Sequence, residues 1–216
     1  MTYNALCEAA EARHLTVLGG FHPEESDGAP ENCKTLLLLG PSAPGFWPAF
    51  KGSAEAQDGA PDPMDRWSER VIGDWAAEAG ATALYPFGGP PWQPFFSWAL
   101  RTGRIHASPV MLLVHDTAGL LVSFRGALAL PQHIDLPPAP PPPCESCPDQ
   151  PCQAACPVNA FDGTGYNVEA CKGFLNEVSG AACVSGGCLV RRACPVSARY
   201  PRAADHSAYH MTIFRG

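Results

Sequence analysis

The chain has 216 residues, of which 46% are hydrophobic, which is enough for one large domain or two small ones with a real core. Its formal net charge is −7 and no stretch is strongly basic, so we expect no nucleic-acid partner. No apolar run could span a membrane, and the first residues carry acids where a signal peptide has a basic and then an apolar region. We therefore expect a cytoplasmic protein that does not insert into a membrane, in a compartment that keeps thiols reduced.

Helices and strands interleave along the first 135 residues. In chain order, the pattern predicts a helix over 4–14, an apolar run over 15–20, a buried strand over 35–39, a helix over 63–79, an extended stretch over 83–87, a helix over 92–101 and strands over 110–114 and 120–128. The helix over 63–79 has the clearest ends, because Asp62 can cap it, Pro63 suits its first position and Gly80 follows it.

The last two strands should pair as a hairpin, since the five residues that join them include Gly119. We therefore predict an α+β fold, with an antiparallel or mixed sheet and helices packed on it. A run rich in proline, 136–143, follows this part and favours a semi-rigid polyproline II spacer. The predicted organisation is an α+β domain over 1–135, a linker over 136–143 and a small domain over 144–216.

Eight of the ten cysteines follow the linker, in two runs that each end in Cys-Pro, with one cysteine alone between the runs. They are Cys144, Cys147, Cys152 and Cys156; then Cys171; then Cys183, Cys188 and Cys194. Eight thiolates are the number that two [4Fe–4S] clusters need, and a run that ends in Cys-Pro is typical of bacterial ferredoxins. Zinc and a disulfide framework are the alternatives, but only the first two cysteines have the C-x2-C spacing of a zinc ribbon. We expect the other two cysteines, Cys7 and Cys33, to be buried free thiols.

The order of the eight cysteines resembles the twin-cluster ferredoxin module of the epoxyqueuosine reductases and reductive dehalogenases. That resemblance implies one cluster held by Cys144, Cys147, Cys152 and Cys194, and a second held by Cys156, Cys171, Cys183 and Cys188. Three of the spacings here are two residues longer than is usual in the family. The stretch from His115 to Pro131 is similar to the last strands before the module, and segments 36–50 and 85–92 are loosely similar to loops of flavin-reductase-like, cobalamin-processing proteins.

The function that we predict is a redox protein that passes electrons through two [4Fe–4S] clusters to a cofactor or substrate at the first domain. The resemblance implies a corrinoid (cobalamin) there, and a flavin is the other candidate. The alternatives are a ferredoxin-type electron carrier with no reaction of its own and a cobalamin-binding protein with accessory clusters. No catalytic residue can be named, because the Arg-Asp-Tyr-His-like stretch of the reductases is not found, so whether the chain is an oxidoreductase stays open. The partner would be a redox protein or a small-molecule acceptor.

Three further features have simpler interpretations. Arg191 and Arg192 lie between two cluster cysteines, and we expect them to offset the negative charge of a cluster. His115 is expected to be a solvated loop histidine. His206 and His210 have the spacing of a helical metal-binding pair, but no third ligand is evident.

Overall fold

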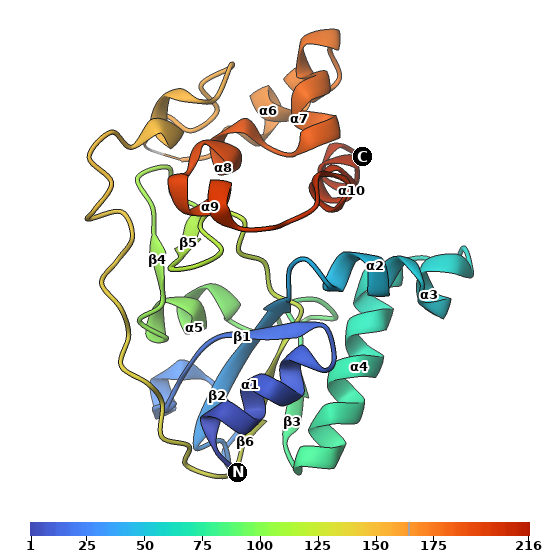
Figure 1. The fold of residues 1–216 in the computed structure, drawn as a ribbon, viewed down its shortest axis with the longest axis vertical. Helices are drawn as coiled ribbons and strands as arrows, with labels where there is room; N and C mark the ends of the chain where they lie inside the picture. Colours follow the sequence, from blue (N-terminus) through green and yellow to red (C-terminus); the bar gives the residue numbers. More distant parts are fainter. Residues whose placement is uncertain (164) are drawn as a thin grey trace. The chain divides into compact units, whose positions relative to one another are not determined.

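Figure 1 shows the computed structural model of the chain, which describes residues 1–163 and 165–216. The chain divides into two compact units, and each unit is built from two separate stretches. The first unit consists of Met1–Ile105 and Ser123–Pro140, and the second of His106–Val122 and Pro141–Gly216. Residues 106–122 therefore pack with the cysteine-rich part, whereas the sequence boundary assigns them to the first domain.

The first unit is built on a four-stranded sheet with the order β1-β2-β6-β3, in which every neighbouring pair is antiparallel. The strands are β1 (Leu15–Phe21), β2 (Thr35–Pro41), β3 (Thr82–Leu84) and β6 (Gly126–Leu130). All residues of β2 and β6 are buried. A strand that is covered on both faces is expected to be apolar throughout, and the four consecutive leucines of β2 are fully buried for this reason.

Helices cover this sheet, and three of them, α2, α4 and α5, bury aromatic side chains. They are α1 (Tyr3–Glu11), α2 (Phe46–Lys51), α3 (Ala54–Gln57), α4 (Pro63–Ala79) and α5 (Phe95–Arg101), with a short 3-10 turn, η1 (Glu25–Asp27). Helix α4 packs on β3 and β6, and α1 and α5 pack on β1. Pro63 and Gly80 bound α4 as the sequence predicts, but the Asp62 side chain accepts no capping hydrogen bond.

The second unit is mostly helical. A two-stranded sheet of β4 (Ile105–Ala107) and β5 (Leu113–His115) stands at its start. The other elements are η2 (Pro151–Ala154), α6 (Val168–Leu175), η3 (Val178–Gly180), α7 (Ala181–Gly186), α8 (Leu189–Ala193), α9 (Pro195–Arg199) and α10 (Ala204–Arg215). The proline-rich run before them contains no helix or strand.

The hairpin predicted over 110–128 is wrong. Strand β5 pairs with β4, whereas β6 lies between β2 and β3 in the sheet of the first unit. The chain between β5 and β6 is held instead by the second unit, because the Leu120 N–H donates to the Ser197 hydroxyl at 2.8 Å and the Arg202 guanidinium donates to the Leu121 carbonyl at 2.9 Å. The apolar run 120–128 is therefore divided, with its first residues in the second unit and the rest in the first.

The coarse prediction of the fold is confirmed, since the chain combines helices with antiparallel sheet as an α+β protein does. Within the described part of the chain, no helix is both long enough and apolar enough to cross a bilayer.

Candidate metal centre

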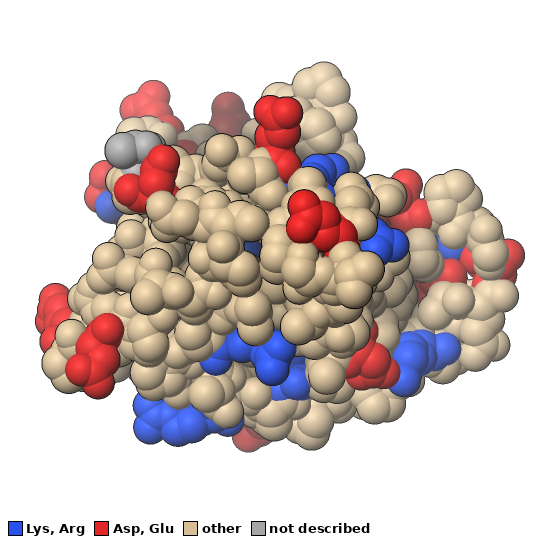
Figure 2. Space-filling model, turned by 90° about the horizontal axis from the view of Figure 1, so that it is seen from above, with Lys and Arg blue, Asp and Glu red and all other residues tan. Residues whose placement is uncertain are grey.

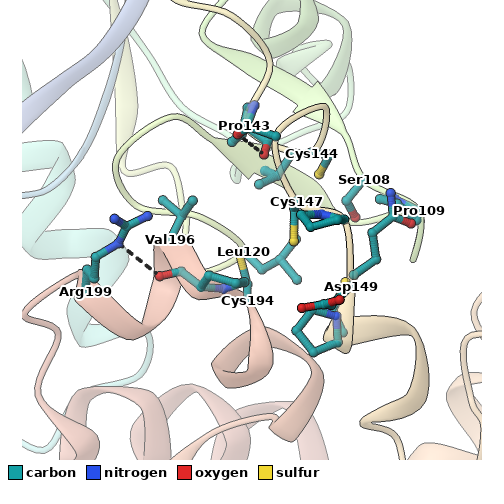
Figure 3. A pocket seen from close by; sticks show the side chains of 17 residues that line it. Ser108, Pro109, Leu120, Pro143, Cys144, Cys147, Asp149, Cys194, Val196 and Arg199 are labelled. Carbon is teal, nitrogen blue, oxygen red and sulfur yellow. Dashed lines mark hydrogen bonds between the residues drawn. The ribbon is translucent and has the colours of Figure 1, made fainter.

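Four of the predicted cysteines surround one cavity of the second unit. Cys144, Cys147, Cys152 and Cys194 all line a cavity of about 260 Å³, which Figure 3 shows from close by. The first three lie in the loop and 3-10 turn that follow the linker, and the fourth lies directly before α9. The fold therefore brings together thiols that are far apart in the sequence, and they are the four that the resemblance assigns to one cluster.

Two of these thiols are harder to ionise than an ordinary cysteine. Burial raises the pKa of the Cys144 thiol above its ordinary value, and the neighbouring Cys152, Cys194 and Cys147 raise it further. Burial also raises the pKa of Cys152, with Cys194 and Cys147 acting in the same direction. Four thiolates this close would repel one another, so the site favours the thiolate form only when cations share the cavity.

The other four cysteines form a second set. Burial raises the pKa of Cys183, and Cys188, Cys171 and Cys156 raise it further. Burial raises the pKa of Cys171 in the same way, and there the nearby thiols are again Cys188 and Cys156. None of the thiols that act on these two belongs to the first set.

Hydrogen bonds orient the thiols of this second set. The Ala160 N–H donates to the Cys156 sulfur at 3.2 Å. The Tyr166 side chain is hydrogen-bonded to Cys171, and Tyr166 stacks on Phe161 with ring centroids 4.4 Å apart. Burial raises the pKa of the Tyr166 hydroxyl, so this group keeps its proton and donates. A hydrogen bond donated to sulfur stabilises the thiolate form of the cysteine relative to the thiol.

Prolines fix the backbone beside the thiols. Pro195 occupies the first turn of α9 and Pro151 the first turn of η2. A residue before proline is driven out of the helical region, and Cys194 accordingly has φ −64° and ψ 123°. The Cys194-Pro195 pair thus turns the chain from an extended, thiol-bearing residue into α9, and the fixed φ of Pro195 reduces the freedom of that turn.

The core of the second unit is built around the cysteines. Its buried members are Val110, Val114, Leu120, Cys152, Ala160, Phe161, Val190 and Cys194, and four more of the eight cysteines and four apolar residues pack against them. Three of the buried residues come from the stretch before the linker. An apolar shell of this kind keeps water from the thiols and sets the potential of any group bound to them.

One positive charge lies close to the second set of cysteines. Arg191 is half-buried, and its guanidinium donates to the Leu120 carbonyl. Burial lowers the pKa of Arg191, while the nearby Cys188 acts in the opposite direction. Arg191 therefore has two roles in the second unit. It holds the stretch 106–122 through Leu120, and its charge lies close to the Cys188 thiol. On the face drawn in Figure 2, acidic and basic side chains are interspersed and most of the surface carries neither charge.

The donor set and the cavity fit an iron–sulfur cluster. Among the described residues, no three His, Cys, Asp or Glu side chains are arranged to hold a single metal ion. Thiolates that share one tetrahedral zinc lie about 3.8 Å apart, because each Zn–S bond is about 2.3 Å. A [4Fe–4S] cluster gives each thiolate its own iron, so its four ligands surround a larger space. All ten cysteines are free of disulfides, which leaves the eight thiols available as ligands.

The remaining candidates are His115, the pair His206 and His210, and the two cysteines outside the runs. His115 is buried rather than solvated, with 3% of its surface exposed, and its Nδ1 accepts from the N–H groups of Thr117 and Ala118. His206 and His210 approach each other, with 3.2 Å between their Nε2 atoms. Cys7 and Cys33 are only partly buried.

The segments likened to cofactor loops belong to the first unit. Residues 36–50 form most of β2 and the start of α2, and residues 85–92 are a loop without helix or strand that ends at the exposed Trp92. One residue of the cavity wall, Ser108, has no signal in the sequence, because two strands and the linker separate it from Cys144, the first of the eight cysteines.

Comparison with protein-family models, with curated proteins and with solved structures gave no match to this chain.

Proposed function

We propose that the chain is an iron–sulfur redox protein that binds two [4Fe–4S] clusters and passes electrons through them to an acceptor at the first unit. The observation that carries this proposal is the cavity that Cys144, Cys147, Cys152 and Cys194 line together. Four thiolates are the ligands of one cluster, and the four that remain in the second unit would hold another. The second unit would then be a ferredoxin-like domain with two clusters.

The residues around the thiols suit this role. When bound, the clusters supply one-electron chemistry, and the protein supplies position and potential. The thiols of both sets would hold the irons, and the apolar residues Val110, Val114 and Leu120 exclude water beside them. Arg191 contributes positive charge next to Cys188, where the bound cluster is negative.

The acceptor follows from the resemblance to the epoxyqueuosine reductases and reductive dehalogenases. A corrinoid is the first candidate and a flavin the second, held by the first unit as a flavin-reductase-like domain. A reducing, cytoplasmic environment would keep the thiols and the clusters intact. If the first unit holds neither cofactor, the chain would act as a ferredoxin-type carrier.

Metal analysis of the protein purified and reconstituted without oxygen tests the proposal. We expect about eight irons and matching acid-labile sulfide per chain, with visible absorbance that dithionite bleaches. A colourless protein that holds two zinc ions after the same treatment would contradict it. The control is a chain in which Cys7 and Cys33 are both replaced by Ser, which should bind the same amount of iron.

Titration of the loaded protein with cob(II)alamin and, separately, with FMN identifies the acceptor. Saturable absorbance changes with one of them, and none with the other, would define the cofactor of the first unit. No change with either at high micromolar concentration would favour the carrier. Neither outcome alters the iron content, so the two parts of the proposal are judged separately.

A further inference from the structure

Ser108 is held rigidly in the turn between β4 and β5. Its N–H donates to the Leu112 carbonyl at 2.9 Å, and its carbonyl accepts from the Met111 N–H at 2.9 Å. Both backbone groups are therefore satisfied within the turn, and the position of the side chain is set by the turn rather than by a bond of its own.

The Ser108 hydroxyl is a buried donor with nothing to bond. The residue is 7% exposed, and within the described part of the chain its Oγ has no hydrogen-bond partner and almost no accessible surface. Burying a hydroxyl without a partner is costly, so such a group in a native protein calls for a missing acceptor. A sulfide ion, or a cysteine sulfur that has become a thiolate on binding iron, would be such an acceptor.

The residue that carries this hydroxyl lies at the cavity that the four thiols line. Ser108 belongs to the wall formed with Cys144, Cys147, Cys152 and Cys194. Figure 3 shows Ser108 among the side chains that surround this cavity. Its partner in the loaded protein would therefore be a sulfur atom of the group that fills this cavity.

We propose that the Ser108 hydroxyl donates a hydrogen bond to a sulfur of the first cluster and raises the reduction potential of that cluster. This inference rests on the proposed function. Reduction adds one electron and hence negative charge to the cluster, while no bond to the protein forms or breaks. A fixed donor stabilises the reduced form more than the oxidised form, because a hydrogen bond to a more negative acceptor is stronger. Ser108 is thus a positioning residue that sets a potential without being a ligand.

Redox titration of the Ser108→Ala variant, followed by electron paramagnetic resonance, tests this role. We expect unchanged iron content and two reduction waves, one of which moves to lower potential. A hydrogen bond of ordinary strength predicts a roughly tenfold fall in the reduced fraction at fixed potential, which is about 59 mV for one electron. The moved wave should be the one that disappears when Cys144 is replaced by Ser.

Two further comparisons keep the test decisive. Ser123 also has a buried hydroxyl without a partner in the described structure, but it lies in the first unit and does not line the cavity. Ser123→Ala should leave both waves in place. If Ser108→Ala does not load, the pair Ser108→Thr and Ser108→Val replaces it: Thr should keep the original potential and Val should lower it.

The outcomes separate this inference from the proposed function. If the unsubstituted protein binds no iron, both the proposed function and this inference are refuted. A protein that loads fully but has the same potentials with and without the Ser108 hydroxyl refutes only the inference. Equal shifts for Ser108→Ala and Ser123→Ala would also refute it, because the effect would not depend on the cavity.

Discussion

The change Gly119→Ala tests whether residues 106–122 are an integral part of the second unit. Gly119 lies in the turn after β5 with a φ of +58°, a region that an L residue with a side chain rarely adopts. A Cβ added there would lie 2.5 Å from the N and Oγ atoms of Ser197 in α9. The substitution therefore imposes backbone strain and also pushes the turn away from α9, the helix that directly follows Cys194.

The cost can be worked from these two effects. The left-handed backbone costs about 1–2 kcal/mol for alanine. Overlap with well-packed atoms adds about 1–3 kcal/mol, since one of them is backbone and cannot rotate away. The sum is roughly 2–5 kcal/mol for the second unit. Gly28→Ala is the matched control, because Gly28 has a φ of +65° but no atom within 4 Å of the added Cβ. It should cost only the first 1–2 kcal/mol.

The two units carry separate spectroscopic reporters. All five tryptophans lie before residue 99, in the first unit, whereas the eight predicted ligands lie in the second. Denaturant unfolding is followed by tryptophan fluorescence for the first unit and by loss of cluster absorbance for the second. Gly119→Ala should lower the absorbance midpoint and spare the fluorescence midpoint, and Gly28→Ala should do the reverse with a smaller shift. An absorbance midpoint that Gly119→Ala does not lower would refute the packing argument.

Three other predictions concern the thiols and one ion pair. Cys171→Ser should halve the iron content and leave one reduction wave, and loss of neither cluster would mean that the ligand sets are wrongly divided. Burial raises the pKa of Cys33 to about 11 from an ordinary value of 9.0, so this thiol should react with iodoacetamide at neutral pH roughly a hundredfold more slowly than an unperturbed one; labelling as fast as a free cysteine would contradict its burial. The hydrogen bond from Arg70 lowers the pKa of Glu55 from 4.5 to about 2. Because the folded pKa is depressed, the stabilisation is complete above about pH 4.5 and is lost as the pH falls through about 2. Glu55→Gln should therefore lower the free energy of unfolding by about 0.2–1 kcal/mol at pH 7, and urea titrations near pH 1 should show no difference.

Local patterns explain why parts of the fold could be predicted. The helix over 63–79 has its breaker and cap residues next to it in the sequence, and its ends match the structure. The leucine run over 35–39 is long enough for a strand and too short for a helix, and it forms the centre of the sheet. In contrast, residues 120–128 form a plausible strand whose partner depends on distant contacts. The hydrogen bond from Leu120 to Ser197 holds the start of this run in the second unit. The residues next to Leu120 in the sequence do not predict that contact.

The sequence by itself determined the chemistry of this protein: eight thiols in a fixed order, prolines that set their backbone, and a boundary rich in proline. It also determined the α+β class, because periodicity and turn residues act over a few positions. Only the tertiary structure decided which thiols share a cavity, and that a serine upstream of the linker lines the same cavity. It also decided that His115 is buried. These features are contacts between residues far apart in the chain, and packing free energy selects them after the local structure has formed.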